Sequence, residues 1–502
     1  MHRQGRSILA LATLMAVSAD RSQAAPSLQE AAQVLGAEKA RSLEYSGTGR
    51  WFQFGQAPAP TLAWPPFEVS RYTASLDYDK SSARVQIARI QVVEPGRQRP
   101  VPAEQKVDQF VVGTTAWNVA VPAGAAPGTA PTANAQPAAV TERVAEIWAT
   151  PQGFLRAAIA NKAAAKPSGG GLEVSFTTGG KYRYVGFVNA RNEVERVQTW
   201  IATPVLGDTL VETTFSDYKE LGGVPFPSRI VRTIGAHPVL DLEVSAVQLN
   251  PKVEIAVPSA IANATAPVVT VTADKLADGV YYLKGGTHHS VAIEQRDHVV
   301  VVEAPLNEER SLAVIAKVKE TIPGKPIKYL VNTHAHFDHS GGLRTYVDEG
   351  ATIVTHQTNK PYYEKAWAAP RTIDPDRLAQ SKKTARFETF TDKHTFGDGN
   401  RPIEIHSIAG NSHNDAFALV YLPKERLLVE ADAFTPAAAD APPPASPNPY
   451  TVNLYENVQK LKLDVDRIAA LHGPRLTTLE DVRTVIGQAK AADVKAPAKA
   501  GQ

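Results

Sequence analysis

Three histidines and one aspartate stand within six residues of this chain, in the stretch H-A-H-F-D-H at residues 334–339. The apolar run before it, residues 327–331, has the length and composition of a buried strand, and residues 343–348 after it have a helical pattern. The stretch therefore falls on a strand-to-helix loop. Imidazole and carboxylate groups together bind zinc, and also iron or manganese, so this loop predicts a metal site.

The positions of the histidines and the absence of cysteine limit which residues can bind the metal. Eleven of the thirteen histidines lie between His288 and His472, and the chain has no cysteine. Without thiolates, the ligands must be His, Asp and Glu, and no disulfide can stabilise the fold. Three buried imidazoles in six residues would each need a polar partner if no metal were bound, which makes a purely structural role costly.

The composition indicates a globular chain that is long enough for more than one domain. Hydrophobic residues make up 43% of the 502 residues and charged residues 21%. No apolar run reaches the roughly 20 residues that a membrane span needs, so we expect no transmembrane segment in the mature chain. The formal net charge is only +2. A nucleic-acid partner is therefore not expected, and the expected partner is a small-molecule substrate.

The N-terminus has the pattern of a secretory signal peptide. Arg3 and Arg6 precede an apolar stretch at residues 7–19, and small residues follow as far as Ala24. We therefore predict a signal peptide at residues 1–24 and an exported, periplasmic protein.

Residues 28–257 are expected to form a mainly antiparallel β domain. Alternating runs, such as residues 72–78 and 240–244, are broken by Gly and Pro and have one apolar face. Residues 120–139 are rich in Ala, Pro, Gly and Thr and lack periodicity, which predicts a flexible insertion. The further predicted strands are residues 84–93, 109–119, 172–177, 182–189, 195–202 and 210–218.

Part of this region has a more specific resemblance. The strand rhythm of residues 207–218, followed by G-G-V-P-F-P at residues 222–227, is similar to the sheet domains of periplasmic lipoprotein-carrier-like proteins. The resemblance implies an envelope location and an apolar ligand groove. A plain structural sheet is the alternative.

A second domain is predicted at residues 268–487, after an Ala- and Pro-rich linker at residues 258–267. Strand-like and helix-like segments alternate in it, which is typical of α/β layers. The Ala- and Lys-rich residues 488–502 are predicted to form a disordered tail.

The second domain resembles the metallo-β-lactamase-fold hydrolases. Their signature is H-x-H-x-D-H followed by a distal His, a distal Asp and a final His. Here His413 stands in a loop before an apolar strand, and Asp432 and His472 each end an apolar run. The family more often has Gly before the distal His, where this chain has Ser412, so His406 remains an alternative to His413. The resemblance implies an αββα sandwich, and its motif set is highly specific.

The resemblance also implies a ligand set for two divalent metal ions, zinc first, with iron or manganese as alternatives. One ion would be bound by His334, His336 and His413, and the other by Asp338, His339 and His472. Asp432 would bridge both ions.

Three further residues are expected near this centre. Glu303 stands where the family commonly has Asp, and we expect it to support the metal loop from behind. His288 and His289 lie on a turn that borders the active site in this fold, where they could contact substrate. Ordinary turn residues are the alternative for these two histidines.

The expected reaction is hydrolysis, because two adjacent metal ions provide a bridging hydroxide near neutral pH. Asp338 is the candidate to orient this nucleophile and to move a proton. According to the resemblance, Asp432 at the bridging position indicates the broader hydrolases of the fold. We therefore expect an exported hydrolase of a small ester, lactone or amide, with residues 435–449 bordering its pocket. The alternatives are a mononuclear iron enzyme like the persulfide dioxygenases of this fold, a β-lactamase, and a ligand-binding envelope protein with an idle metal domain.

Overall fold

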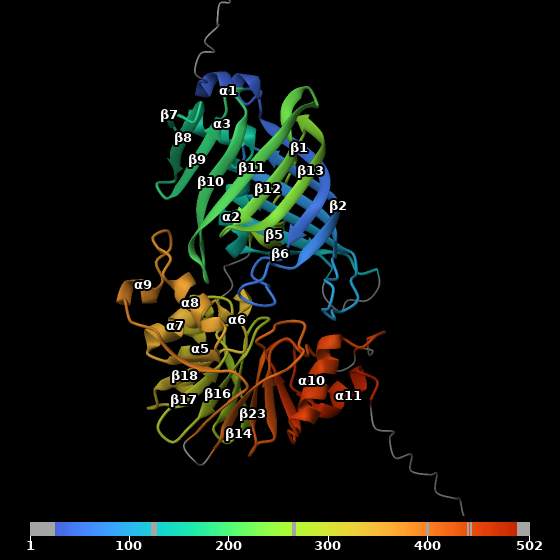
Figure 1. Cartoon of the computed structure of the whole chain (residues 1–502), viewed down its shortest axis with the longest axis vertical. Helices are drawn as coiled ribbons and strands as arrows, with labels where there is room; N and C mark the ends of the chain where they lie inside the picture. The colour runs from blue at the N-terminus through green and yellow to red at the C-terminus, as the bar shows by residue number, and fades with distance from the viewer. Residues whose placement is uncertain are drawn as a thin grey trace, which may run out of the picture.

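The structure, a computed structural model, shows two parts of the chain that follow each other along its longest axis (Figure 1). It describes residues 26–121, 128–263, 268–397, 401–438, 441 and 444–488. The predicted signal peptide and residues 489–502 of the predicted tail lie outside these ranges. Among the described helices, none is both long and apolar enough to cross a membrane.

The N-terminal part is built on one antiparallel sheet of thirteen strands. Its order is β6-β5-β4-β3-β2-β1-β13-β12-β11-β10-β9-β8-β7, so that β1 pairs with β13 in the middle of the sheet. The strands are β1 (Ser42–Phe52), β2 (Pro66–Asp77), β3 (Ser82–Gln91), β4 (Gln105–Val112), β5 (Thr115–Ala120), β6 (Thr132–Ala135), β7 (Ala164–Ser168), β8 (Gly171–Thr178), β9 (Tyr182–Val188), β10 (Val194–Thr203), β11 (Gly207–Leu221), β12 (Val224–Ile234) and β13 (His237–Leu249).

Three helices pack with this sheet into one apolar core. Buried and partly buried residues alternate along most of β10, as expected where one face of a sheet is packed. The buried side chains of Ile147 and Phe154 contact the same core as the strands. The predicted mainly antiparallel β domain is therefore confirmed. The three helices are α1 (Leu28–Val34), α2 (Val140–Trp148) and α3 (Pro151–Ala160), and a short 3-10 turn, η1 (Pro137–Ala139), precedes α2.

Two segments of this part differ from the sequence predictions. Residues 109–119 do not form one strand but belong to the hairpin of β4 and β5, because Gly113, with φ of 55°, turns the chain between them. Within residues 120–139, predicted as an insertion, Thr132–Ala135 forms β6 and pairs with β5. Residues of β6 are mostly exposed, so no apolar pattern marks the strand in the sequence.

The C-terminal part contains two sheets. The first has the order β14-β15-β16-β17-β18-β19-β20 and the second β21-β22-β23-β24-β25-β26. The first sheet consists of β14 (Thr272–Ala277), β15 (Val280–Lys284), β16 (Ser290–Glu294), β17 (Val299–Val302), β18 (Ile327–Val331), β19 (Thr352–His356) and β20 (Arg386–Phe390). The second consists of β21 (Lys393–Phe396), β22 (Ile403–Ser407), β23 (Ala418–Leu422), β24 (Leu427–Glu430), β25 (Arg467–Ala470) and β26 (Thr477–Thr478).

Helices cover the outer faces of both sheets (Figure 1). Alternate residues of β17 show the layering, because Val300 and Val302 pack toward the second sheet while Val299 and Val301 pack with α5 and α7. This is the αββα sandwich predicted for the second domain. The helices are α4 (Ser259–Ala262, in the predicted linker), α5 (Glu308–Thr321), α6 (Phe337–Ser340), α7 (Leu343–Glu349), α8 (Asn359–Trp367), α9 (Arg377–Ser381), α10 (Pro449–Lys460) and α11 (Leu479–Val485).

Candidate metal centre

Each of the seven predicted ligands lies just after the end of a strand or in a connection between two strands of the two sheets. The loop after β18 carries His334 and His336 and leads into α6, which carries Asp338 and His339. The chain leaves β24 just before Asp432 and leaves β25 just before His472, while His413 lies in the connection between β22 and β23. A backbone hydrogen bond of 2.9 Å from Ala418 N to Thr333 O joins the two sheets here. The fold therefore brings side chains of distant segments together.

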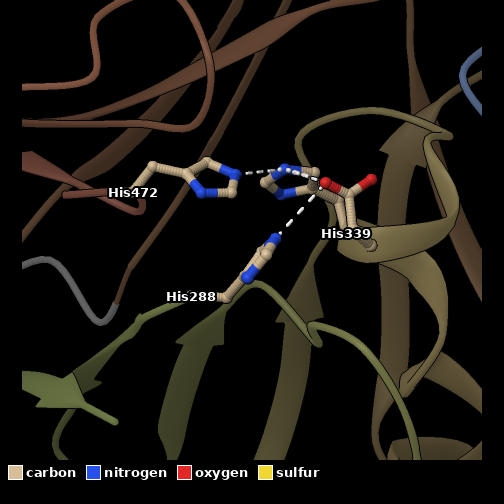
Figure 2. A group of neighbouring side chains, drawn as sticks. His288, His339 and His472 are labelled. Carbon is tan, nitrogen blue, oxygen red and sulfur yellow. Dashed lines mark hydrogen bonds and ion pairs between the residues drawn. The ribbon is translucent and has the colours of Figure 1, made fainter. Parts of the chain in front are cut away.

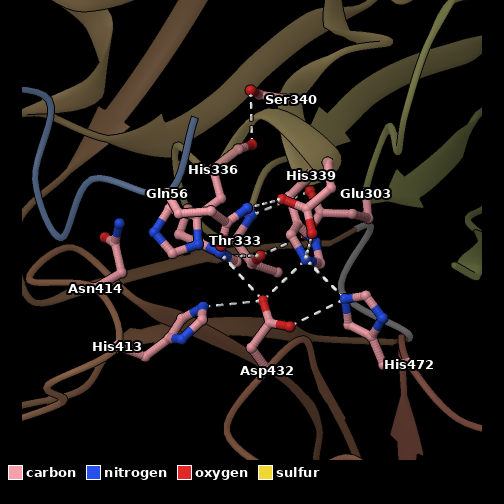
Figure 3. A network of polar contacts seen from close by, with 12 residues as sticks. Gln56, Glu303, Thr333, His336, His339, Ser340, His413, Asn414, Asp432 and His472 are labelled. Atoms are coloured by element: carbon pink, nitrogen blue, oxygen red, sulfur yellow. Dashed lines mark hydrogen bonds and ion pairs between the residues drawn. The ribbon is translucent and has the colours of Figure 1, made fainter. Parts of the chain in front are cut away.

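A first group consists of His334, His336, His413 and Asp432, whose ligand atoms all lie within 4.8 Å of one another. Asp432 Oδ2 lies 3.2 Å from His334 Nε2 and 3.3 Å from His413 Nε2 (Figure 3). Each residue of this group has one buried side-chain atom without a hydrogen-bond partner among the described residues: His334 Nε2, His336 Nδ1, His413 Nε2 and Asp432 Oδ2. Buried polar atoms are rarely left unpaired. Four of them in one place fit a bound cation.

A second group consists of His288, Asp338, His339 and His472. Figure 2 shows its three histidines arriving from different segments, with the Nε2 atoms of His339 and His472 3.0 Å apart. His288 Nε2 lies 3.3 Å from Asp338 Oδ2. His288 thus joins a group that the sequence predicted without it.

Asp432 lies between the two groups. Its Oδ1 is 3.0 Å from His472 Nε2, and its Oδ2 is 2.8 Å from His339 Nε2 and 3.2 Å from His334 Nε2. One carboxylate therefore faces ligands of both groups, as expected for a residue that bridges two ions.

In three histidines, a contact between one ring nitrogen and an oxygen determines which nitrogen remains available for a metal. His336 Nε2 donates to Ala57 O at 3.0 Å, His334 Nδ1 lies 3.0 Å from Thr333 Oγ1, and His339 Nδ1 lies 3.1 Å from a carboxylate oxygen of Glu303. A ring that donates from one nitrogen leaves the lone pair of the other available for a metal. The other nitrogens of these rings, His334 Nε2, His336 Nδ1 and His339 Nε2, are those that face the ligand groups.

The charges of the centre follow from burial and from its own carboxylates. Burial lowers the pKa of His334 to about 4 and holds the pKa of His336 well below its ordinary value. Burial alone would do the same to His339, but Asp432 and Asp338 outweigh it and raise the pKa of His339 well above its ordinary value. Neutral imidazole is the form that binds metal, so His334 and His336 are ready as ligands near neutral pH.

Both ligand carboxylates are ionised. Burial raises the pKa of Asp338, but the charge of His339 and the hydrogen bond with His288 outweigh it and lower the pKa below its ordinary value. Burial likewise opposes ionisation of Asp432, but His339 and His413 hold its pKa well below the ordinary value. The centre therefore offers two negative charges to a cation.

Glu303 lies behind the metal loop, as the sequence predicted. It is fully buried and accepts hydrogen bonds from Asn332 Nδ2 at 3.1 Å and from Thr333 Oγ1. Its φ of 76° is unusual for a residue other than glycine, and such strain persists only where the surroundings enforce it. Glu303 also forms a third candidate group with His334 and His339, with ligand atoms within 4.8 Å of one another. Its oxygens, however, are already engaged by Asn332, Thr333 and His339, as expected for a residue that orients ligands.

The other histidines considered from the sequence lie away from both groups. His289 Nε2 donates to Gly473 O at 2.7 Å, and the backbone N–H of Gly285 donates to His289 Nδ1 at 3.4 Å. Both ring nitrogens of His289 thus have backbone partners, and His289 belongs to neither ligand group. His406 Nε2 lies 2.8 Å from Glu404 Oε2, and the groups found among the described residues do not include it. The structure brings His413, not His406, to the centre.

Residues of the N-terminal part reach the centre, which the sequence did not predict. The connection between β1 and β2 brings Gln56, labelled in Figure 3, beside the centre, with its Nε2 2.7 Å from Asp338 Oδ1. The Ala57 carbonyl of the same connection fixes His336. Because Gln56 and Asp338 are 282 positions apart, no local pattern connects them. The signal that could have found them is co-variation in related sequences, which a single sequence lacks.

An apolar cavity of about 820 Å³ lies on another side of the metal loop, between the two parts of the chain. Its lining includes Trp64, Leu210, Phe337 and Tyr362, but none of the seven predicted ligands. It adjoins the metal loop at Ala335 and Phe337, which lie between the ligands of that loop.

Comparison with known families agrees with this geometry. Residues 283–472, less than half of the chain, match the model of the family described as Metallo-beta-lactamase superfamily. All seven predicted ligands lie within the match. The C-terminal part thus has the metallo-β-lactamase fold.

Two curated relatives cover shorter segments. The chain is 23% identical over 168 residues to the 2,4-dinitroanisole O-demethylase subunit alpha of Nocardioides sp. (strain JS1661), across 32% of this chain and 46% of the relative. It is 28% identical over 76 residues to a linear primary-alkylsulfatase of Pseudomonas sp., across 15% of this chain and 11% of the relative. The chain thus spans less than half of either relative.

Solved structures with a similar arrangement include a metallo-beta-lactamase from Pontibacter korlensis, with 17% identity and a TM-score of 0.32 over 44% of this chain and 98% of that one. A metallo-beta-lactamase from Hirschia baltica has 18% identity and a TM-score of 0.31 over 43% of this chain and 96% of that one.

Proposed function

We propose that this chain is an exported hydrolase that uses two divalent metal ions on a small ester, lactone or amide. The observation that carries the proposal is the position of Asp432, whose carboxylate contacts ligands of both groups: Oδ2 lies near His334 and His339, and Oδ1 lies near His472. Imidazole and carboxylate donors without thiolate suit zinc, with iron or manganese as alternatives. Such a pair of ions, when bound, makes hydroxide available near neutral pH and polarises the bond under attack.

Asp338 is proposed to move the proton in this reaction. Its side chain is 29% exposed, whereas that of Asp432 is 16% exposed, so Asp338 is the more accessible of the two carboxylates. Its lowered pKa keeps it ionised, so that its carboxylate can accept a hydrogen bond from the attacking water and orient it. Gln56 and His288 hold its two oxygens in place.

The loop after Asp432 is proposed to border the substrate pocket. Phe434 N donates to buried Glu430 Oε2 at 3.0 Å, which fixes the start of this loop. Pro436 packs closely on Gly473, the neighbour of His472. The ring of Tyr450, at the end of the loop, lies 5.2 Å from the ring of His413. Both ends of the loop thus lie beside proposed ligands.

The test is an activity screen of the zinc-loaded mature chain against lactones, carboxylic esters, amides, β-lactams, phosphodiesters, sulfate esters and thioesters. Alkyl sulfates and aryl methyl ethers join the panel because the two curated relatives are named as an alkylsulfatase and an O-demethylase. Turnover of an ester, lactone or amide is expected, and it should fall strongly in Asp338→Asn assayed at a zinc concentration that fills both sites. Activity toward β-lactams alone, or unchanged turnover in Asp338→Asn, would contradict the proposal.

Export is tested separately. The protein is expressed in a Gram-negative host, and the N-terminus of the mature chain is sequenced from the periplasmic fraction. A start directly after Ala24 is expected, and an intact N-terminus in the cytoplasm would contradict it.

A further inference from the structure

We propose that Gln56, in the N-terminal β domain, is a positioning residue of the metal centre that holds Asp338 in the second ligand group. The inference rests on the proposed two-metal function. It adds that the β domain completes the centre, so that the catalytic domain alone holds its second ion poorly.

The contact itself is direct. Gln56 Nε2 donates to Asp338 Oδ1 at 2.7 Å, which leaves Asp338 Oδ2 toward His288 at 3.3 Å and His339 at 3.6 Å. A carboxylate with one oxygen held by an amide has a fixed rotation about its last bond. Gln56 thus determines which oxygen of Asp338 faces the second group.

The backbone around Gln56 is fixed to the metal loop on both sides. Phe337 N donates to Gly55 O at 3.1 Å, and His336 Nε2 donates to Ala57 O at 3.0 Å. Gly55 has φ of 76°, and a Cβ there would lie 2.5 Å from Phe337 Cγ, so only glycine permits this close approach. Three consecutive residues therefore contact three consecutive residues of the metal loop.

The same connection is anchored by an aromatic cluster. The ring of Phe54 lies 4.6 Å from that of Trp64 and 5.1 Å from that of Phe337, both edge to face. Trp64 is 5% exposed. The connection between β1 and β2 is thus packed against the catalytic domain at Phe337, which keeps Gln56 within reach of Asp338.

A second connection of the β domain contacts the His413 loop. Arg97 forms two hydrogen bonds with the carboxylate of Asp415 at 2.8 and 3.0 Å, and Gln98 N donates to Ser412 Oγ at 3.1 Å. Asp415 N also donates to Pro58 O at 2.7 Å. The β domain therefore holds the segments on both sides of His413 as well as the metal loop.

The test compares Gln56→Met with Gln53→Met in the full chain. Methionine keeps the length of the side chain but lacks the N–H donor. Gln53 lies on the same connection, and its side chain makes no hydrogen bond within the described residues. Gln53→Met therefore controls for effects of a Gln-to-Met substitution that do not involve Asp338. Zinc is titrated against a competing chelator, and backbone hydrogen exchange is measured over residues 334–341 in the metal-free protein.

The second zinc ion is expected to bind about 10- to 100-fold more weakly in Gln56→Met than in Gln53→Met, with the first ion unchanged. Exchange over residues 334–341 is expected to be faster in metal-free Gln56→Met alone. Equal zinc affinities in the two variants, or a loss of both ions together with global unfolding, would overturn the proposal. If the wild type binds a single ion, the proposed two-metal function is wrong. The hydrogen-exchange rates of the two metal-free variants then decide the role of Gln56, and equal rates would overturn that role.

Discussion

The two ligand groups differ in what a metal ion must displace. In the first group, Asp432 Oδ2 lies 3.2 Å from His334 Nε2 and 3.3 Å from His413 Nε2, but neither contact is a hydrogen bond, so an ion displaces none there. In the second group, the ligand atoms are already hydrogen-bonded to one another, with His339 and His472 3.0 Å apart and His288 3.3 Å from Asp338. The difference teaches that the first group is preorganised and that the second must rearrange. We expect the first ion to bind more tightly.

The largest effect is expected for Asp432→Ala, because this residue faces both groups. Removal of its carboxylate should weaken the binding of both ions and lower the rate of hydrolysis by at least about 100-fold. Substitution of a group that only orients a ligand costs up to about this factor. Metal content and kcat/KM are measured. Asp466→Ala, an exposed aspartate of the same domain, is the control. Retention of both ions in Asp432→Ala would show that the groups are independent.

In the metal-free protein, His334 of the first group and His339 of the second should affect the free energy of unfolding in opposite directions as pH rises. Between pH 6.5 and about 4, unfolded His334 takes up a proton that folded His334 does not, so the free energy of unfolding should fall on acidification. Above pH 6.5, folded His339 retains a proton that the unfolded chain loses, so the free energy should also fall as pH rises.

Stability of the metal-free protein should therefore be greatest near pH 6.5. The expected loss toward pH 4 is on the order of 3 kcal/mol. Urea denaturation across this range measures it. Zinc should remove the alkaline loss, because metal binding releases the proton of His339. An alkaline loss that persists with zinc bound would contradict the assignment of His339 as a ligand.

The smallest effects distinguish the neighbours His288 and His289. His288→Ala should weaken the second ion about 10-fold, since its ring contacts Asp338. His289→Ala should lower the free energy of unfolding by about 1–2 kcal/mol through the lost hydrogen bond to Gly473, with both zinc affinities kept. Parallel zinc titrations and urea denaturation measure both. The reverse pattern would exchange the two roles.

The predictable parts of this centre are those that local sequence determines. The strand before the metal loop and the helix after it are β18 and α7, as their apolar patterns predict. Asp432 and His472 were predictable because each follows an apolar strand, β24 or β25. His288 was placed on a turn beside the site, but its membership of the second group depends on how β15 and β16 lie against β25, which no local pattern encodes.

The unpredictable parts depend on contacts between distant segments. Gln56 is a polar residue in an irregular connection, and it is brought to Asp338 by the packing of Phe54 and Trp64 on Phe337 and by the hydrogen bonds of the neighbouring carbonyls with the metal loop. The strand β6 is held by backbone pairing with β5 and has no apolar face. Backbone pairing and docking between domains leave no periodic signal in a single sequence.

The most direct test of the account is a metal count on the full chain during stepwise zinc loading. The account predicts two zinc ions per chain, bound in two steps, with the tighter step abolished by His336→Ala and the weaker step by His472→Ala. A single ion per chain at saturation, and in particular a single iron in protein purified without added metal, would contradict it.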